Sequence, residues 1–229
     1  DGKDGADGKN GVDGKDGIDG KDGEKTVELD ERLLATPSLA IRQSRSVTVE
    51  MAECAVQALK DSLLALEAYT PELAQGIREN EELCDHYEDI IGTYLVKLSS
   101  RRLGVKESEE TTELLKSIGD FERISDHAVN VLASAEEIRD KGLSFSDSAR
   151  TEFATLAAAI REILDISLRA FEQEDTALAA EVEPLEQVID TLKEHLRTHH
   201  ILRMQQGECS IEAGFVWSDL LTDLERTSD

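Results

Sequence analysis

Residues 118–126 read IGDFERISD, and residues 221–229 read LTDLERTSD. The shared core, D-[F/L]-E-R-x-S-D, keeps five of its seven residues and recurs at an offset of 103 positions. A second, weaker repeat precedes each copy: EELCD ends at Asp85 and LEQVID ends at Asp190, 105 positions apart. Chance similarity between two acidic segments explains these matched offsets poorly. The sequence therefore predicts the duplication of a helical unit.

The composition favours helices throughout the repeated region. Aromatic residues make up 4% of the 229 residues and there are 3 prolines, which is unlike a β-sandwich or barrel. Apolar residues recur at helical spacing, as in Leu114, Ile118 and Leu132. Turn signals divide the chain into six expected helices, at residues 38–69, 71–102, 107–141, 147–172, 175–206 and 210–229.

Short connections between these helices predict antiparallel neighbours. We therefore expect an all-α fold made of two tandem, pseudo-symmetric three-helix bundles. The predicted division is a low-complexity segment at 1–26, a first repeat with its lead-in at 27–142, and a second repeat at 143–229, truncated in its last helix. Pro37 is expected at the first position of a helix capped by Thr36.

The first 23 residues have glycine at every third position from Gly2 to Gly23, each preceded by Asp or Asn. Strict Gly-X-Y spacing is the collagen signature, but this tract lacks proline and has few triplets. Three interpretations stay open: a flexible spacer, a collagen-like trimerising stalk, or a calcium-binding tract, although the spacing matches no EF-hand.

The net charge of -25 disfavours nucleic acid and anionic lipid as partners. No apolar run is long enough to cross a bilayer, so we expect no direct membrane insertion. Cys54, Cys84 and Cys209 form no CxxC pair, which fits a reducing, cytosolic compartment. Because the chain begins without Met, we expect a fragment that is soluble by itself.

The repeated motif places two carboxylates one helical turn apart in each copy: Glu122 with Asp126, and Glu225 with Asp229. Asn130 continues the first row by one more turn. Carboxylates at the shoulder of an apolar stripe need compensation by arginines, helix N-termini or a metal ion. Oxygen-rich clusters on facing helices suit hard cations, iron or manganese.

Other residues carry weaker signals. His127 is expected at a surface or an interface, and His195, His199 and His200 on a solvated face, because the HExxH zinc motif is missing. Phe215 and Trp217 are expected as core anchors. No P-loop, nucleophile elbow or dinucleotide fingerprint occurs, so we predict that the chain is not an enzyme.

The runs DFERISDHAVN (120–130) and DLERTSD (223–229) resemble the PhoU family of phosphate-uptake regulators. Ser125 replaces the glycine usual in that motif. The segments LDERLLATPSLAI (29–41), YLVKLSSRRL (94–103) and GECSIEAGFVWSDLLTDLER (207–226) further resemble the PhoU-like region of bacterial sodium/phosphate cotransporter-related proteins.

The resemblance implies a multinuclear iron or zinc cluster, or a similar manganese or magnesium site, in each three-helix bundle. Glu122 and Asp126 would bind metal in the first repeat and Glu225 and Asp229 in the second, with Asp85 and Asp190 as additional candidates. It also implies regulation of phosphate transport at the cytoplasmic face of the inner membrane.

The sequence leads to three hypotheses about function. The leading hypothesis is the cytoplasmic part of a sodium-dependent phosphate cotransporter, with the transporter's membrane domain as partner, in cis or in trans. The alternative is a free-standing adaptor that negatively regulates a phosphate ABC transporter and its sensor kinase. The third is a display head on a collagen-like stalk, and homo-oligomers are compatible with each.

Overall fold

The computed structural model describes residues 28–228, and every regular element in that range is a helix. The elements are η1 (Glu31–Ala35), α1 (Pro37–Glu67), α2 (Pro71–Ser99), α3 (Val105–Lys141), α4 (Asp147–Gln173), α5 (Thr176–Ala179), α6 (Val182–Gln205) and α7 (Ile211–Ser228). The prediction of an all-α fold is confirmed. The predicted Gly-X-Y segment at 1–26 lies outside the described residues.

The helix starts follow from capping chemistry. Thr70 accepts a hydrogen bond from the Leu73 amide at 3.1 Å, and Pro71 occupies the first position of α2, where its missing N–H costs nothing. Pro37 likewise begins α1, as expected, but the Thr36 side chain makes no capping hydrogen bond. The lead-in before α1 forms the short 3-10 helix η1.

One predicted helix is divided into two in the structure. The segment expected to be continuous over 175–206 is interrupted at Ala180 and Glu181, which separate α5 from α6. Pro184 lies at the third position of α6. A proline there cannot donate to a carbonyl four residues earlier, and its ring disfavours helical backbone before it, so α6 starts anew.

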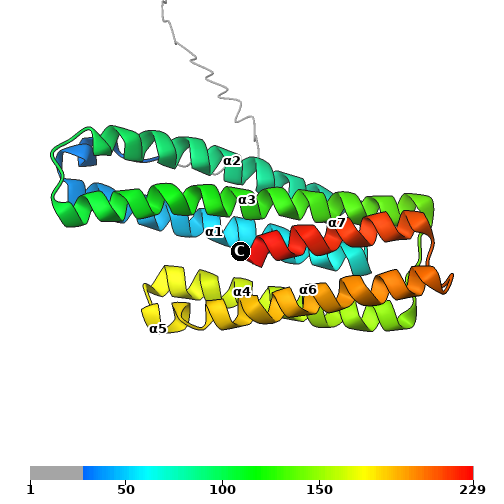
Figure 1. Cartoon of the computed structure of the whole chain (residues 1–229). Helices are drawn as coiled ribbons and strands as arrows, with labels where there is room; N and C mark the ends of the chain where they lie inside the picture. The colour runs from blue at the N-terminus through cyan, green and yellow to red at the C-terminus, as the bar shows by residue number, and fades with distance from the viewer. Residues whose placement is uncertain (1–27, 229) are drawn as a thin grey trace, which may run out of the picture.

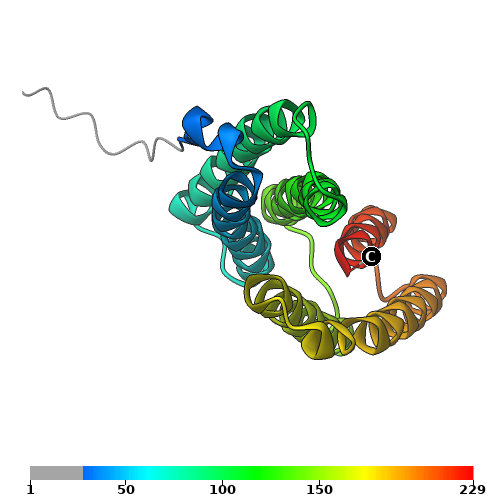
Figure 2. The same cartoon turned by 90° about the vertical axis from the view of Figure 1, so that its left-hand side faces the viewer.

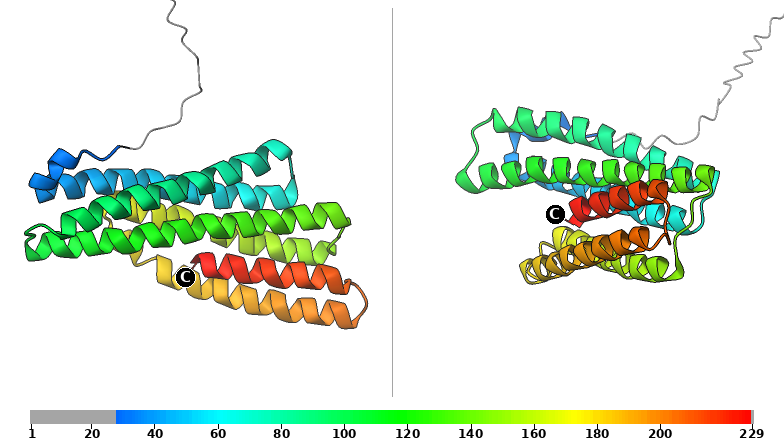
Figure 3. Two further views of the ribbon diagram at one scale, coloured as in Figure 1. Left: turned by 90° about the horizontal axis from the view of Figure 1, so that it is seen from above. Right: turned by 45° about the vertical axis from the view of Figure 1, so that its right-hand side comes forward.

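The helices form two layers that lie along a common direction (Figure 1). Helices α1, α2 and α3 form the first three-helix unit, and α4, α6 and α7 form the second. Viewed end on, α1 and α4 lie against each other on one side, and α7 lies between α3 and α6 (Figure 2). The views in Figure 3 show α7 running beside only part of the longer α3.

Two apolar clusters form the core. One contains buried side chains of η1 and α1–α3 only, among them Met51, Tyr87 and Leu95. The other joins both units, since Leu59, Leu132, Ile160 and Leu221 are all buried in it. The predicted division at residue 142 falls at the end of α3. The two units nevertheless share a core, because the second cluster contains side chains of both.

Trp217 is 2% exposed and belongs to the shared core, as predicted, whereas Phe215 is 68% exposed. The two residues lie about 200° apart around α7, so only one of them can face the core. No helix within residues 28–228 combines the length and hydrophobicity that crossing a membrane requires.

Candidate metal centre

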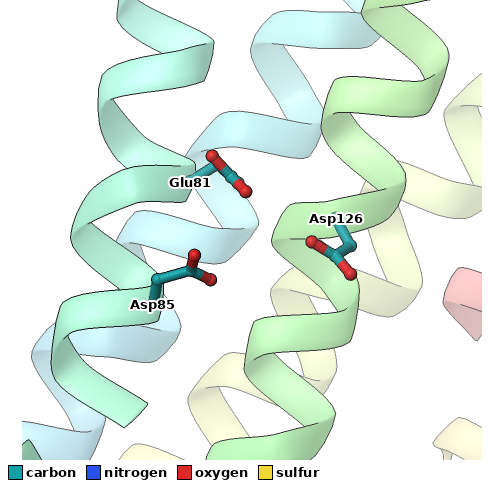
Figure 4. Close-up of side chains that lie close together, drawn as sticks. All are labelled: Glu81, Asp85 and Asp126. Atoms are coloured by element: carbon teal, nitrogen blue, oxygen red, sulfur yellow. The ribbon is translucent and has the colours of Figure 1, made fainter. Parts of the chain in front are cut away.

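Three carboxylates from two helices of the first unit converge. Glu81 and Asp85 project from α2 toward Asp126 on α3, and one oxygen of each lies within 4.8 Å of the other two (Figure 4). Glu81 and Asp85 are one turn apart, with the same E-x-x-x-D spacing as Glu122 and Asp126. Two E-x-x-x-D rows, one on α2 and one on α3, therefore lie next to each other.

The raised pKa values of two glutamates reflect their burial and the nearby carboxylates. Burial raises the pKa of Glu122 to about 7, with further contributions from the charges of Asp126, Glu88 and Asp85. Burial is also the main cause that raises the pKa of Glu81, followed by Asp85 and Asp126. Like charges held this close disfavour simultaneous ionisation.

Basic side chains do not offset this charge. On these same helices Arg78 pairs with Glu136 at 2.7 Å, and Arg123 with Asp120 at 3.7 Å. Within residues 28–228, no ion pair to a basic side chain forms at Glu81, Asp85 or Asp126. An all-oxygen, multiply charged and uncompensated donor set fits a hard cation, so the residues present suit the kind of ion that the sequence predicts.

Two small residues next to the carboxylates, Ser125 on α3 and Cys84 on α2, are buried. Ser125 is fully buried and donates its hydroxyl proton to the Glu122 carbonyl at 2.8 Å. Cys84, also fully buried, lies against Met51 in α1.

His127 and Asn130 of α3 both contact α7. His127 Nδ1 lies 3.1 Å from Asp223 Oδ1, and the Asn130 amide donates to the same oxygen at 3.4 Å. His127 is thus a buried interface residue between the two units, which settles the choice between surface and interface left open by the sequence. The Asn130 amide contacts Asp223 of α7, and its part in a metal site stays a prediction.

The second unit arranges its candidate residues differently. Glu225 forms an ion pair with Lys193 on α6, with 2.6 Å between Oε1 and Nζ. Asp190 is half-buried on α6, and Asp229 lies outside the described residues. Glu225 therefore has a lysine as its neighbour, where Glu122 has carboxylates.

Two residues of the first centre were not identified from the sequence. Glu81 belongs to the carboxylate cluster, and Glu88 helps to raise the pKa of Glu122. On α2, the sequence predicts only Asp85 as a ligand. A signal was available, because Glu81-x-x-x-Asp85 repeats the spacing of the motif on α3 and recurs as Glu186-x-x-x-Asp190. His200 was expected on a solvated face and is 4% exposed, so that prediction is wrong: this side of α6 packs against Trp217 of α7.

Comparisons with known proteins agree with this architecture. The PhoU domain model matches the chain twice, over residues 48–135 and 153–229. The accessory protein PhoU homolog 1 of the phosphate-specific transport system of Thermotoga maritima is 24% identical over 174 residues, which cover 76% of this chain and 74% of that protein. The PhoU homolog of Pseudomonas putida is 25% identical over 192 residues, covering 82% and 73%.

A solved structure shares the fold. The crystal structure of PhoU from Pseudomonas aeruginosa superposes with a TM-score of 0.68 over 86% of this chain and 91% of that one, at 22% sequence identity. Since the two domain matches together span more than half of the chain, the family is established independently of this likeness. The chain belongs to the PhoU family.

Proposed function

We propose that this chain is a metal-binding accessory protein of phosphate uptake, which regulates a phosphate transporter through protein contacts and not through catalysis. The observation that carries the metal-binding part is the convergence of Glu81, Asp85 and Asp126 without a basic partner. The transport part rests on the double match to the PhoU domain and on relatives named as accessory proteins of phosphate-specific transport systems.

In this proposal Glu81, Asp85, Glu122 and Asp126 hold one or more hard or borderline cations, such as iron, manganese, zinc or magnesium. A bound cation would supply positive charge between two rows of carboxylates and hold α2 against α3. Asn130 stays a candidate beside the first row, and Asp190, Glu225 and Asp229 stay candidates for the second unit. Lys193 already supplies a positive charge beside Glu225 there.

The partner is a phosphate transporter, and we propose that the chain acts at the cytoplasmic face of the membrane. A free-standing adaptor has better support than a cotransporter domain, because the relatives described above are accessory proteins. The cotransporter hypothesis rests on the segments 29–41, 94–103 and 207–226. The reading frame upstream of residue 1 tests it, since several long apolar spans there would favour attachment to a transporter.

The metal-binding part is tested by metal analysis of protein purified without oxygen, together with melting in chelator and in added Mn²⁺, Fe²⁺ or Zn²⁺. The Asp126→Asn and Glu81→Gln variants should lose most of the bound metal and the thermal stabilisation by added metal. Glu82→Gln, which changes the exposed neighbour of Glu81, is the matched control and should keep both. Equal metal content in all four proteins would rule out the α2–α3 site.

The regulatory part needs a separate readout. A bacterium lacking its own accessory protein should take up less phosphate in phosphate-rich medium when this chain is expressed. The same host expressing Asp126→Asn tests whether the metal matters for control. Unchanged uptake with the wild-type chain would contradict the regulatory role, whatever the metal content.

A further inference from the structure

A second cluster of potential ligands lies far from the carboxylates, where α6 turns into α7. His200 and Met204 are one turn apart on α6, and Cys209 follows in the connecting segment. The Cys209 sulfur lies 3.9 Å from His200 Nε2. The Met204 sulfur and His200 Nε2 both lie beside Gly214 of α7, 2.8 Å and 3.1 Å from where a Cβ atom of that residue would be.

Gly214 makes this convergence possible. Any side chain there would collide with the Met204 sulfur and press on the His200 ring nitrogen. The close approach of α7 to α6 thus places the His200 nitrogen and the Met204 sulfur beside the same point on the glycine backbone, and the Cys209 sulfur lies next to that nitrogen.

The surroundings hold the imidazole in place. The His200 ring is stacked on Trp217, with 5.5 Å between centroids and an angle of 18° between planes. Arg203 lies over the same indole and pairs with Glu152 at 2.9 Å. The buried Nδ1 atom of His200 has no hydrogen-bond partner, which is an unusual cost for a ring that is 4% exposed.

The donor set selects the class of ion. Thiolate and thioether sulfur are soft ligands that favour Cu(I), and thioether is a poor ligand for hard cations. An ion about 2.0 Å from a nitrogen and about 2.3 Å from a sulfur places those two atoms about 3.5 to 3.8 Å apart. The observed separation of 3.9 Å between His200 and Cys209 needs almost no adjustment to reach this geometry.

We propose that His200, Met204 and Cys209 form a binding site for a soft monovalent ion, Cu(I). On binding, the Cys209 S–H bond breaks, its proton leaves to solvent, and a Cu–S bond forms with no change of oxidation state. His200 would bind the ion through Nε2, the ring nitrogen that lies next to the Cys209 sulfur. The site is independent of the carboxylate cluster and does not require the function proposed above.

The test is an anaerobic titration with Cu(I) against a chromophoric Cu(I) chelator. Wild-type protein should bind one Cu(I) per chain at this site. Cys209→Ser should weaken binding at least about 100-fold and Met204→Leu at least about 10-fold, because even changes outside the ligand set cost about 10- to 100-fold in metal affinity. Cys54→Ser is the matched cysteine control and should bind within about twofold of wild type, and Glu81→Gln should also retain Cu(I).

Two further measurements keep the proposal falsifiable if a variant folds poorly. X-ray absorption of the Cu(I)-loaded wild type should show one nitrogen and two sulfur neighbours, and a spectrum with only nitrogen or oxygen neighbours overturns the proposal. Equal displacement by Zn²⁺ shows that the site is not selective for a soft monovalent ion and overturns that assignment. Cys209→Ser protein that folds and binds Cu(I) like wild type removes the site altogether.

Discussion

Lys193 Nζ lies 2.6 Å from Glu225 Oε1, whereas at the 105-residue offset the first unit has Glu88 in the place of this lysine. Glu88 helps to raise the pKa of Glu122, the counterpart of Glu225. The same backbone position thus adds negative charge to one centre and cancels it in the other. The duplicated units keep their fold but differ in the charge that lies beside the corresponding glutamate.

Replacing Lys193 with Met should expose this difference. Loss of the half-buried ammonium leaves Glu225 without its partner, and the free energy of unfolding at pH 8 should fall by about 1 to 2 kcal/mol. Added Mn²⁺ should recover part of that stability. Chemical denaturation measures the effect, with Lys116→Met as the exposed control, and equal stability of the two variants would contradict it.

The metal-free protein should become less stable as pH rises from 6 to 8. Glu122 has a folded-state pKa of about 7 against an ordinary value of 4.5, so between these values the folded protein holds a proton that the unfolded chain has lost. The stability linked to that proton is present at low pH and disappears as pH passes 7. Solvent screening leaves an effect on the order of 1 kcal/mol.

Thermal melts in chelator at pH 6, 7 and 8 measure this dependence. Glu122→Gln stays neutral at every pH and should flatten the part of the profile due to Glu122, which separates it from the contribution of every other group. If wild type and Glu122→Gln show parallel profiles, Glu122 does not carry the raised pKa.

Much of the fold could be predicted from the sequence, because buried side chains such as Leu114, Ile118 and Leu132 repeat at helical spacing. The helical pattern continues across the break before α6, so the periodicity alone does not predict it. Pro184 near the start of α6 is the residue that indicates it. Phe215 was predicted as core, although its angular distance from Trp217 around α7 already excludes burial of both.

Only the α3 half of the candidate centre could be predicted from the sequence motif. The motif on α3 identifies Glu122 and Asp126, but the partner carboxylates depend on which face of α2 packs against α3. Similarly, the sequence does not say that Lys193 faces Glu225 or that His200 faces Trp217, because those contacts depend on the rotation of α6 about its axis.

The contact between His127 and Asp223 should hold the two units together. Both side chains are largely buried, and the 3.1 Å contact joins α3 to α7. His127→Ala and Asp223→Ala should each destabilise the protein by about 1 to 3 kcal/mol, because Asp223→Ala leaves His127 Nδ1 unpaired and His127→Ala leaves Asp223 only the longer bond from Asn130. Urea unfolding of both single variants and the double variant gives the coupling, expected at about 1 kcal/mol or more, and strict additivity would show that no coupling exists.

Two glycine substitutions should change stability in opposite directions. Neither Gly76, inside α2, nor Gly142, after α3, has any atom within 4 Å of the place of a Cβ, so an added methyl group causes no collision at either. Gly142 has φ +60° and its amide caps α3 by hydrogen bonds to Arg139 and Ile138 carbonyls. An alanine disfavours that left-handed conformation, so Gly142→Ala should lower the free energy of unfolding by about 1 kcal/mol.

Gly76→Ala should raise it by about 1 kcal/mol, because alanine loses less backbone entropy than glycine in a helix. Since both changes add the same methyl group to open space, the difference of about 2 kcal/mol between the two variants comes from backbone conformation alone. Chemical denaturation of the two variants side by side measures it. A change of the same sign in both would mean that the end of α3 does not require a left-handed residue.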